Sequence, residues 1–150
     1  MITIKKGDLM NATEKVIGHQ VNCMGIAGGL AADIFKKWPF AKNDYYQLIK
    51  RVPGKALLGM AHFTGQHRDG HIVCNLYGQY EPGAAYNPQR LEQALEMLGN
   101  TARIMDWSVA LPWHLSCGIC GGNWEEVQQI IERTMDGVDC VIYQREGDDK

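Results

Sequence analysis

Two glycine-rich segments of this sequence have the residue types that hold an anion. The first runs from Val21 to Ala31 and the second from Ser116 to Trp124, and each follows an apolar stretch and leads into a helical pattern. Glycine lets main-chain N–H groups come close to a phosphate, and a helix N-terminus adds unpaired amides and the positive end of its dipole. We therefore expect the two segments to hold a diphosphate from opposite sides.

The familiar nucleotide-binding fingerprints are absent from the sequence. Neither G-x-x-x-x-G-K-[ST] nor G-x-G-x-x-G occurs in it, which argues against a P-loop or a Rossmann site. Turns from strand to helix also need glycine for packing alone, so either segment taken singly is equally consistent with a structural role. The pattern gives no reason to expect a bound cofactor.

A second kind of chemistry comes from Cys117 and Cys120, which form a C-x-x-C at the expected start of a helix. A thiolate is stabilised at the start of a helix, as in thiol–disulfide oxidoreductases. The alternative function is therefore a thiol–disulfide oxidoreductase that uses these two cysteines. Its position late in the chain argues against it, because thioredoxin-like domains place the motif after their first strand. We therefore expect that these cysteines are not a redox couple.

Three histidines, His62, His67 and His71, lie close together in the sequence and raise the question of a metal site. Asp69 alone accompanies them at ligand spacing, and a zinc or transition-metal site needs more partners than this. We expect no metal.

The elements that position these residues alternate between strand and helix patterns. Strands are expected at 2–5, 14–22, 56–64, 71–76, 108–112 and 138–143, and helices after Gly28, Ala41, Asn87 and Asn123. The 56–64 and 71–76 strands flank a polar turn and predict an antiparallel hairpin. The fold class is therefore α/β, a three-layer α/β/α sandwich with a mixed central sheet of about six strands. The glycine segments should project from the carboxyl ends of strands.

Composition predicts one domain over residues 1–150 in the cytoplasm. The chain is 45% hydrophobic, has no apolar run long enough to span a membrane, and has five scattered cysteines that do not form a disulfide framework. The net charge of −2 divides into +5 for residues 1–75 and −7 for residues 76–150. We interpret this as differently charged faces, so general nucleic-acid binding is not expected, and neither is membrane binding.

Several short motifs together resemble one known family. They are Gly7-Asp8-Leu9, Val21-Asn22, Gly28-Gly29-Leu30-Ala31, Cys117-Gly118-Ile119 and Gly121-Gly122-Asn123-Trp124, in the family's order and over nearly the whole chain. This pattern resembles a macrodomain, and is most similar to small bacterial or phage-type members, near the branch that contains terminal-ADP-ribose glycohydrolases and DNA-ADP-ribose-removing antitoxins. The resemblance implies binding of ADP-ribose or of ADP-ribosylated protein or nucleic acid.

The resemblance also implies a set of ligand contacts. Asp8 and Leu9 would lie beside the adenine, and Asn22 near the distal ribose. The two glycine segments would surround the diphosphate, and the irregular segment after the fourth strand would act as a lid. The implied contact residues of the first segment are Gly28, Gly29, Leu30 and Ala31, and those of the second are Ser116, Cys117, Gly118, Ile119, Cys120 and Gly121. The implied lid residues are Gln79, Tyr80 and Tyr86.

Catalytic groups of the family's hydrolases are replaced in this sequence. Ala31 stands where one class has an aspartate, and Gln79 and Cys120 stand where the glycohydrolase branch has a lysine and an aspartate. Asn22 remains as a residue that could hold a water against a ligand phosphate. We expect an ADP-ribose binder with at most slow hydrolysis of ADP-ribosyl esters or ADP-ribose 1″-phosphate.

Overall fold

The computed structural model describes residues 2–82, 87–115 and 123–145, and the following statements concern these residues. Its strands and helices alternate as the sequence predicts. In chain order they are β1 (Ile2–Lys6), the short 3-10 helix η1 (Leu9–Asn11), β2 (Val16–Asn22), α1 (Gly29–Lys37), α2 (Pro39–Arg51), α3 (Gly54–Leu57), β3 (Ala61–Gln66), β4 (Ile72–Gln79), α4 (Pro88–Met105), β5 (Val109–Pro112), α5 (Trp124–Thr134) and β6 (Cys140–Gln144).

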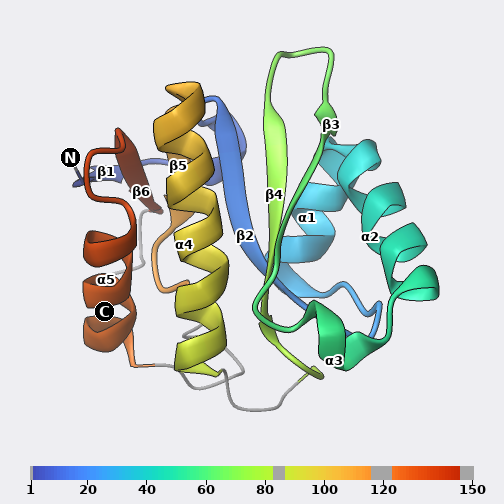
Figure 1. The fold of residues 1–150 in the computed structure, drawn as a ribbon. Helices are drawn as coiled ribbons and strands as arrows, with labels where there is room; N and C mark the ends of the chain where they lie inside the picture. The colour runs from blue at the N-terminus through green and yellow to red at the C-terminus, as the bar shows by residue number, and fades with distance from the viewer. Residues whose placement is uncertain (1, 83–86, 116–122, 146–150) are drawn as a thin grey trace.

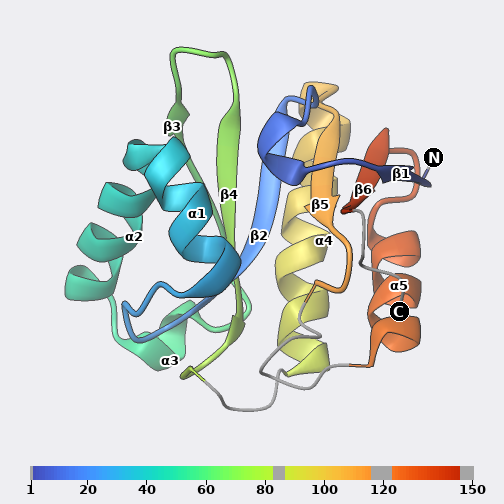
Figure 2. The same cartoon turned by 180° about the vertical axis from the view of Figure 1, so that it is seen from behind.

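The six strands form one mixed sheet in the order β1-β6-β5-β2-β4-β3. All neighbouring pairs are parallel except β3 and β4, which form the expected antiparallel hairpin. Helices α4 and α5 cover one face of the sheet and α1 and α2 cover the other (Figures 1 and 2). The predicted three-layer α/β/α sandwich is confirmed.

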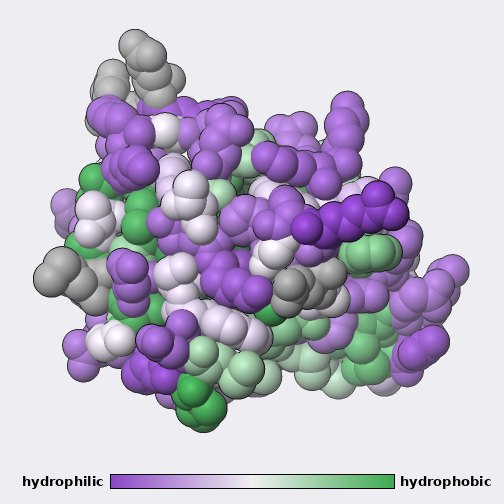
Figure 3. Space-filling model, turned by 90° about the horizontal axis from the view of Figure 1, so that it is seen from above, coloured by the Kyte–Doolittle hydropathy of each residue, from purple (hydrophilic) through white to green (hydrophobic). Residues whose placement is uncertain are grey.

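Each face of the sheet has its own hydrophobic core, because the strands at its centre are buried on both sides. Leu95, Leu98 and Ile131 pack in the core under α4 and α5. Ile17, Ile34 and Tyr45 pack in the core under α1 and α2. Seen from above, the end of the molecule that carries the β3–β4 turn is covered mainly by hydrophilic side chains (Figure 3). None of the described helices is long and apolar enough to cross a membrane.

The helix starts follow the local signals in the sequence. Asn87 caps α4 by accepting a hydrogen bond from the backbone N–H of Arg90, and Pro88 occupies the first helical position. Asn123 caps α5 in the same way. Pro39 occupies the first position of α2, so this helix begins two residues before the expected start at Ala41. Proline at a first helical position lacks only an N–H that would have had no partner.

One predicted strand is too long. Residues 56–64 were expected to be extended throughout, but the structure has the single turn of α3 followed by β3 from Ala61. The Ala56 N–H donates to the carbonyl of Pro53, and Gly59 adopts a positive φ of 92° that turns the chain before the strand begins. Hydrophobic periodicity cannot distinguish a short buried helix from a strand of the same length.

His19 lies inside the fold rather than at its surface. Its side chain is 1% exposed, its Nε2 lies 2.7 Å from Asn75 Oδ1 on the paired strand β4, and its ring meets Phe35 edge-on. Because a carboxamide oxygen only accepts, Nε2 carries the proton and Nδ1 has no partner in the described part of the chain. Burial lowers the pKa of His19 to about 4, and the hydrogen bond with Asn75 offsets only part of this effect.

The lowered pKa of His19 predicts a loss of stability in mild acid. Above the ordinary pKa of 6.5 both the folded and the unfolded chain hold a neutral imidazole, whereas below it only the unfolded chain takes up the proton. The free energy of unfolding should therefore fall by about 2 kcal/mol between pH 6.5 and pH 5 because of this residue. Denaturant titrations at several pH values measure it.

The matched variant is His19→Gln, which keeps a donor for Asn75. Burial also lowers the pKa of His67, so the His19 contribution is the difference between the wild-type and His19→Gln curves. Parallel curves for these two proteins would contradict the assignment.

Candidate functional site

The first glycine segment leaves the carboxyl end of β2 at the centre of the sheet. There the β2–β4 register shifts between Val21 and Asn22, so that Asn22 pairs with Gln79. Such an irregularity re-aims a side chain at the end of a strand. β2 lies between β5 and β4, so the carboxyl ends of these three strands meet at one edge of the sheet (Figure 1).

The carboxamide of Asn22 holds the segment in place. Its Oδ1 accepts from the backbone N–H of Met24 at 2.9 Å and of Ile26 at 3.4 Å, and its Nδ2 donates to the Ile26 carbonyl at 2.7 Å. Asn22 is only 7% exposed. The side chain that was expected to hold a water is thus already engaged by backbone groups of the segment.

Tyr45 of α2 completes this arrangement from outside the segment. Its hydroxyl lies 2.8 Å from the carbonyl oxygen and 2.9 Å from Oδ1 of Asn22, and its side chain is fully buried. Burial raises the pKa of Tyr45 far above its ordinary value. The hydroxyl is therefore a hydrogen-bond donor at neutral pH and takes no part in acid–base chemistry.

A small polar cavity opens beside Asn22. Its volume is about 90 Å3, and residues of β2, the glycine segment, α1, α2 and β4 form its wall. They are Gln20, Val21, Asn22, Ile26, Ala27, Gly28, Ala31, Tyr45 and Gln79. Side-chain carboxamides and main-chain groups supply the hydrogen-bonding atoms of the cavity.

The start of α1 borders the cavity. Gly28 is the N-cap, with an extended φ of −139°, and no side chain in the described part of the chain caps the helix, so its first amides can bind a ligand. Gly29 has a positive φ of 53°, which glycine adopts without strain. A Cβ on either glycine would meet no atom of the described residues within 4 Å. The open space beside these amides is the geometry that the sequence predicted for an anion.

The other expected site residues fall into three groups. Ala31 and Gln79 line the cavity. Leu30 and Tyr80 are partly buried and pack against the core under α1 and α2. Leu9 is 3% exposed within that core, and the Asp8 carboxylate accepts from the Met10 N–H as the cap of η1. The remaining candidates, Tyr86, Ser116, Cys117, Gly118, Ile119, Cys120 and Gly121, lie outside the described residues.

Sequence reasoning missed two contributors to the cavity. Gln20 shares the strand face of Asn22, because residues two apart in a strand point to the same side, so this alternation could have identified it. No sequence signal identifies Tyr45, because α2 is an ordinary amphipathic helix and the contact spans 23 residues. Among the described residues, no group of three histidine, cysteine, aspartate or glutamate side chains is arranged to hold a metal.

No family model matches the chain. It is 29% identical to the curated DNA ADP-ribosyl glycohydrolases of Mycobacterium tuberculosis and Mycobacterium bovis over 98% of its length. The chain spans 43% of the length of these relatives.

Solved structures match the fold over almost the whole chain. The macrodomain of Mycobacterium tuberculosis DarG superposes with a TM-score of 0.83 at 29% identity, covering 95% of this chain and 97% of that one. The macrodomain of Thermus aquaticus DarG gives 0.80 at 21% identity, covering 96% and 98%. Thermosipho africanus DarTG in complex with ADP-ribose gives 0.79 at 16% identity, covering 94% and 41%. With this sheet, this glycine segment and this similarity, the chain has the fold of a macrodomain.

Proposed function

We propose that this macrodomain binds ADP-ribose, free or attached to a protein or a nucleic acid, at the cavity beside Asn22. The observation that carries the proposal is the polar hollow of about 90 Å3 next to the uncapped N-terminus of α1. The hollow offers carboxamides to the hydroxyls of a sugar, and the helix start offers amides to a phosphate. ADP-ribose joins these two groups in one molecule.

The solved relative from Thermosipho africanus, which is described as a complex with ADP-ribose, supports the same ligand through its fold. In the proposed pose the distal ribose enters the cavity and the diphosphate lies against Gly28 and Gly29. Asp8 keeps its predicted role at the adenine, through the carboxylate oxygen that does not cap η1. The second glycine segment, with Cys117 and Gly118, stays the predicted opposite wall.

The site is suited to binding rather than to catalysis. The side chains of the described cavity include no carboxylate, imidazole or amine, and its one ionisable group, Tyr45, stays protonated. The curated relatives act on ADP-ribosylated DNA by their name, but Gln79 can neither form an imine nor move a proton. Slow hydrolysis through a positioned water is the most that we assign.

A cytoplasmic location is part of the proposal. Cys23, Cys74 and Cys140 are free and buried, which is typical of proteins in a reducing compartment. The thiol–disulfide alternative receives no support from the fold or from the relatives named above.

Gly28→Glu should abolish ADP-ribose binding without unfolding the protein. Its backbone is extended, and the new side chain meets open space, so no strain is expected. The glutamate would place negative charge where the diphosphate must lie. Calorimetry should give a dissociation constant on the order of micromolar for the wild type and at least a hundred-fold weaker binding for Gly28→Glu.

Gly65→Glu is the matched control, because its Cβ also meets nothing within 4 Å and it lies in β3, away from the cavity. It should bind like the wild type. AMP should bind more weakly than ADP-ribose because it lacks the distal ribose. Unchanged affinity of a folded Gly28→Glu variant would refute the site.

Tyr45→Phe should weaken ADP-ribose binding by loosening the glycine segment. The variant removes the donor shared by the two oxygens of Asn22, worth about 1 kcal/mol or a five-fold loss in affinity. Asn22→Ala, which also removes the contacts to Met24 and Ile26, should cost at least ten-fold. Tyr46→Phe, the neighbour on α2, is the control and should keep wild-type affinity. Equal affinities for all four proteins would exclude this role for Asn22.

Hydrolysis should be slow and nearly independent of pH. We expect no rapid multiple turnover on mono-ADP-ribosylated protein, on ADP-ribosylated DNA or on ADP-ribose 1″-phosphate. Any residual rate should stay flat between pH 6 and pH 8, because no described cavity side chain titrates in that range. Chromatography of the released product measures both the rate of turnover and its dependence on pH. Fast turnover, or a rate that follows a single pKa in this window, would show that a catalytic acid or base acts at the site.

A further inference from the structure

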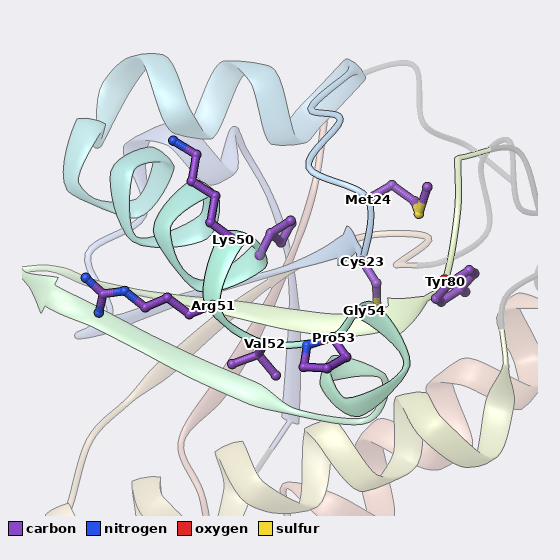
Figure 4. Close-up of a pocket in the computed structure, with 9 residues that line it drawn as sticks. Cys23, Met24, Lys50, Arg51, Val52, Pro53, Gly54 and Tyr80 are labelled. Carbon is purple, nitrogen blue, oxygen red and sulfur yellow. The ribbon is translucent and has the colours of Figure 1, made fainter.

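The edge of the sheet that carries the cavity extends beyond it in two directions. Where Cys23 and Tyr80 follow β2 and β4, an open groove of about 470 Å3 adjoins this edge (Figure 4). In the other direction the parallel strands β5, β6 and β1 follow β2, so β1 also ends at this edge. Three strand spacings separate the end of β1 from β2, which amounts to about 14 Å. The residues that follow β1, Gly7 and Asp8, therefore lie within reach of the far end of a long ligand in the cavity.

The chain between β1 and β2 forms an ordered segment on the face of the sheet that α1 and α2 cover. This η1 segment comprises residues 7–15 and contains the helix η1. Leu9 and Ala12, which are 3% and 5% exposed, anchor its middle in the core of that face. The Asp8 carboxylate caps η1 through Oδ1, and its Oδ2 has no hydrogen-bond partner among the described residues. A carboxylate oxygen of this kind can accept from an N–H of a ligand.

Tyr143 of β6 holds the η1 segment at both of its ends. Its ring lies against Gly7, where an added Cβ would stand 3.5 Å from Cδ2 of the ring, and the Gly7 N–H donates to the Gln144 carbonyl at 3.0 Å. At the other end of the segment, the Tyr143 hydroxyl donates to Glu14 Oε1 at 2.6 Å. Tyr143 is only 5% exposed. One rigid side chain therefore connects the start of the segment to its end.

The surroundings of Tyr143 keep its hydroxyl a donor. Burial raises the pKa of Tyr143, as does the hydrogen bond to Glu14, and contacts with Thr13 offset only part of this effect. The Glu14 carbonyl accepts from His71 Nδ1 at 2.7 Å, so the residue that receives the hydroxyl is itself held by the residue before β4. The bond between Tyr143 and Glu14 therefore has a fixed partner at each end at neutral pH.

We propose that Tyr143 is a positioning residue for base selectivity, which holds the η1 segment so that Asp8 Oδ2 accepts from the exocyclic amine of adenine and disfavours a base with a carbonyl there. The inference rests on the proposed function, because ADP-ribose in the cavity brings its base toward the end of β1. A carbonyl in place of the amine would set two acceptors against each other. That mismatch costs affinity only while Asp8 cannot move away from it.

The position of Asp8 in the chain explains why it depends on Tyr143. Asp8 lies between Gly7, which rests on the Tyr143 ring, and Leu9, which is buried in the core. The ring and the hydroxyl belong to one side chain, so loss of the bond to Glu14 lets the ring shift and Gly7 follow it. The Asp8 carboxylate can then adjust to a carbonyl, and selectivity falls.

The test compares ADP-ribose with inosine diphosphate ribose, in which hypoxanthine replaces adenine and a carbonyl replaces the amine. We expect the wild type to prefer ADP-ribose by about ten-fold or more, because a hydrogen bond to a carboxylate is exchanged for two opposed acceptors. Tyr143→Phe keeps the ring and removes the hydroxyl. It should reduce the preference to about three-fold or less by weakening ADP-ribose, with little change for the inosine analogue. Calorimetry measures both affinities, and thermal unfolding checks the fold.

Glu14→Gln is the conservative variant, because it retains a side-chain oxygen for the Tyr143 hydroxyl and should keep most of the preference. Glu14→Ala removes the acceptor and should lose the preference, and it tests the same bond if Tyr143→Phe does not fold. Tyr45→Phe is the matched control, since it removes another buried tyrosine hydroxyl from the same core but acts at the cavity. It should weaken both ligands by the same factor and leave their ratio unchanged.

Three outcomes would overturn the inference and leave ADP-ribose binding standing. They are a preference that survives in Tyr143→Phe and Glu14→Ala, a parallel loss of affinity for both ligands in these variants, and equal affinity of the wild type for the two ligands. The second of these would show a general structural role, and the third would show that Asp8 does not read the base. If the folded wild type binds neither ligand, the proposed function itself fails.

Discussion

The hydrogen bonds of the Asn22 carboxamide organise this end of the molecule. One side chain, 7% exposed, binds two backbone N–H groups and one carbonyl of the segment that follows it, and Tyr45 reaches in from α2 to bind the same residue. A glycine-rich turn has many conformations in the unfolded chain, so fixing it needs contacts of this kind. The positions of the cavity and of the start of α1 both depend on this turn.

The turn is held between two elements that the sheet brings together. Tyr45 belongs to the core under α1 and α2, so the packing of that core sets where its hydroxyl lies. Gly25, with a φ of 79°, lets the segment run close to Ile49 of the same helix. The segment therefore owes its shape to helix packing as much as to its own glycines, and a change in α2 acts on the ligand site through this contact.

The chemistry of the site follows from which groups face it. Asp8 and His19 are engaged in the cap of η1 and in the β2–β4 core. Burial raises the pKa of the Cys23 thiol to about 11, so this thiol is not a nucleophile at neutral pH. What remains at the described cavity is a set of amides and hydroxyl donors. Such groups stabilise a charged ligand but do not transfer its protons.

The sequence by itself determined the order of the strands and of the main helices, the three-layer sandwich and the place of the first glycine segment. These features depend on patterns within a few residues, such as alternation along a strand, the caps Asn87 and Asn123, and glycines after an apolar run. Only the tertiary structure decided that Tyr45 binds Asn22, that His19 is buried against Asn75, and that the Tyr80 ring lies against Gly54. These contacts join residues 23 to 56 positions apart, and the packing of helices and strands that brings them together leaves no spacing in a single sequence.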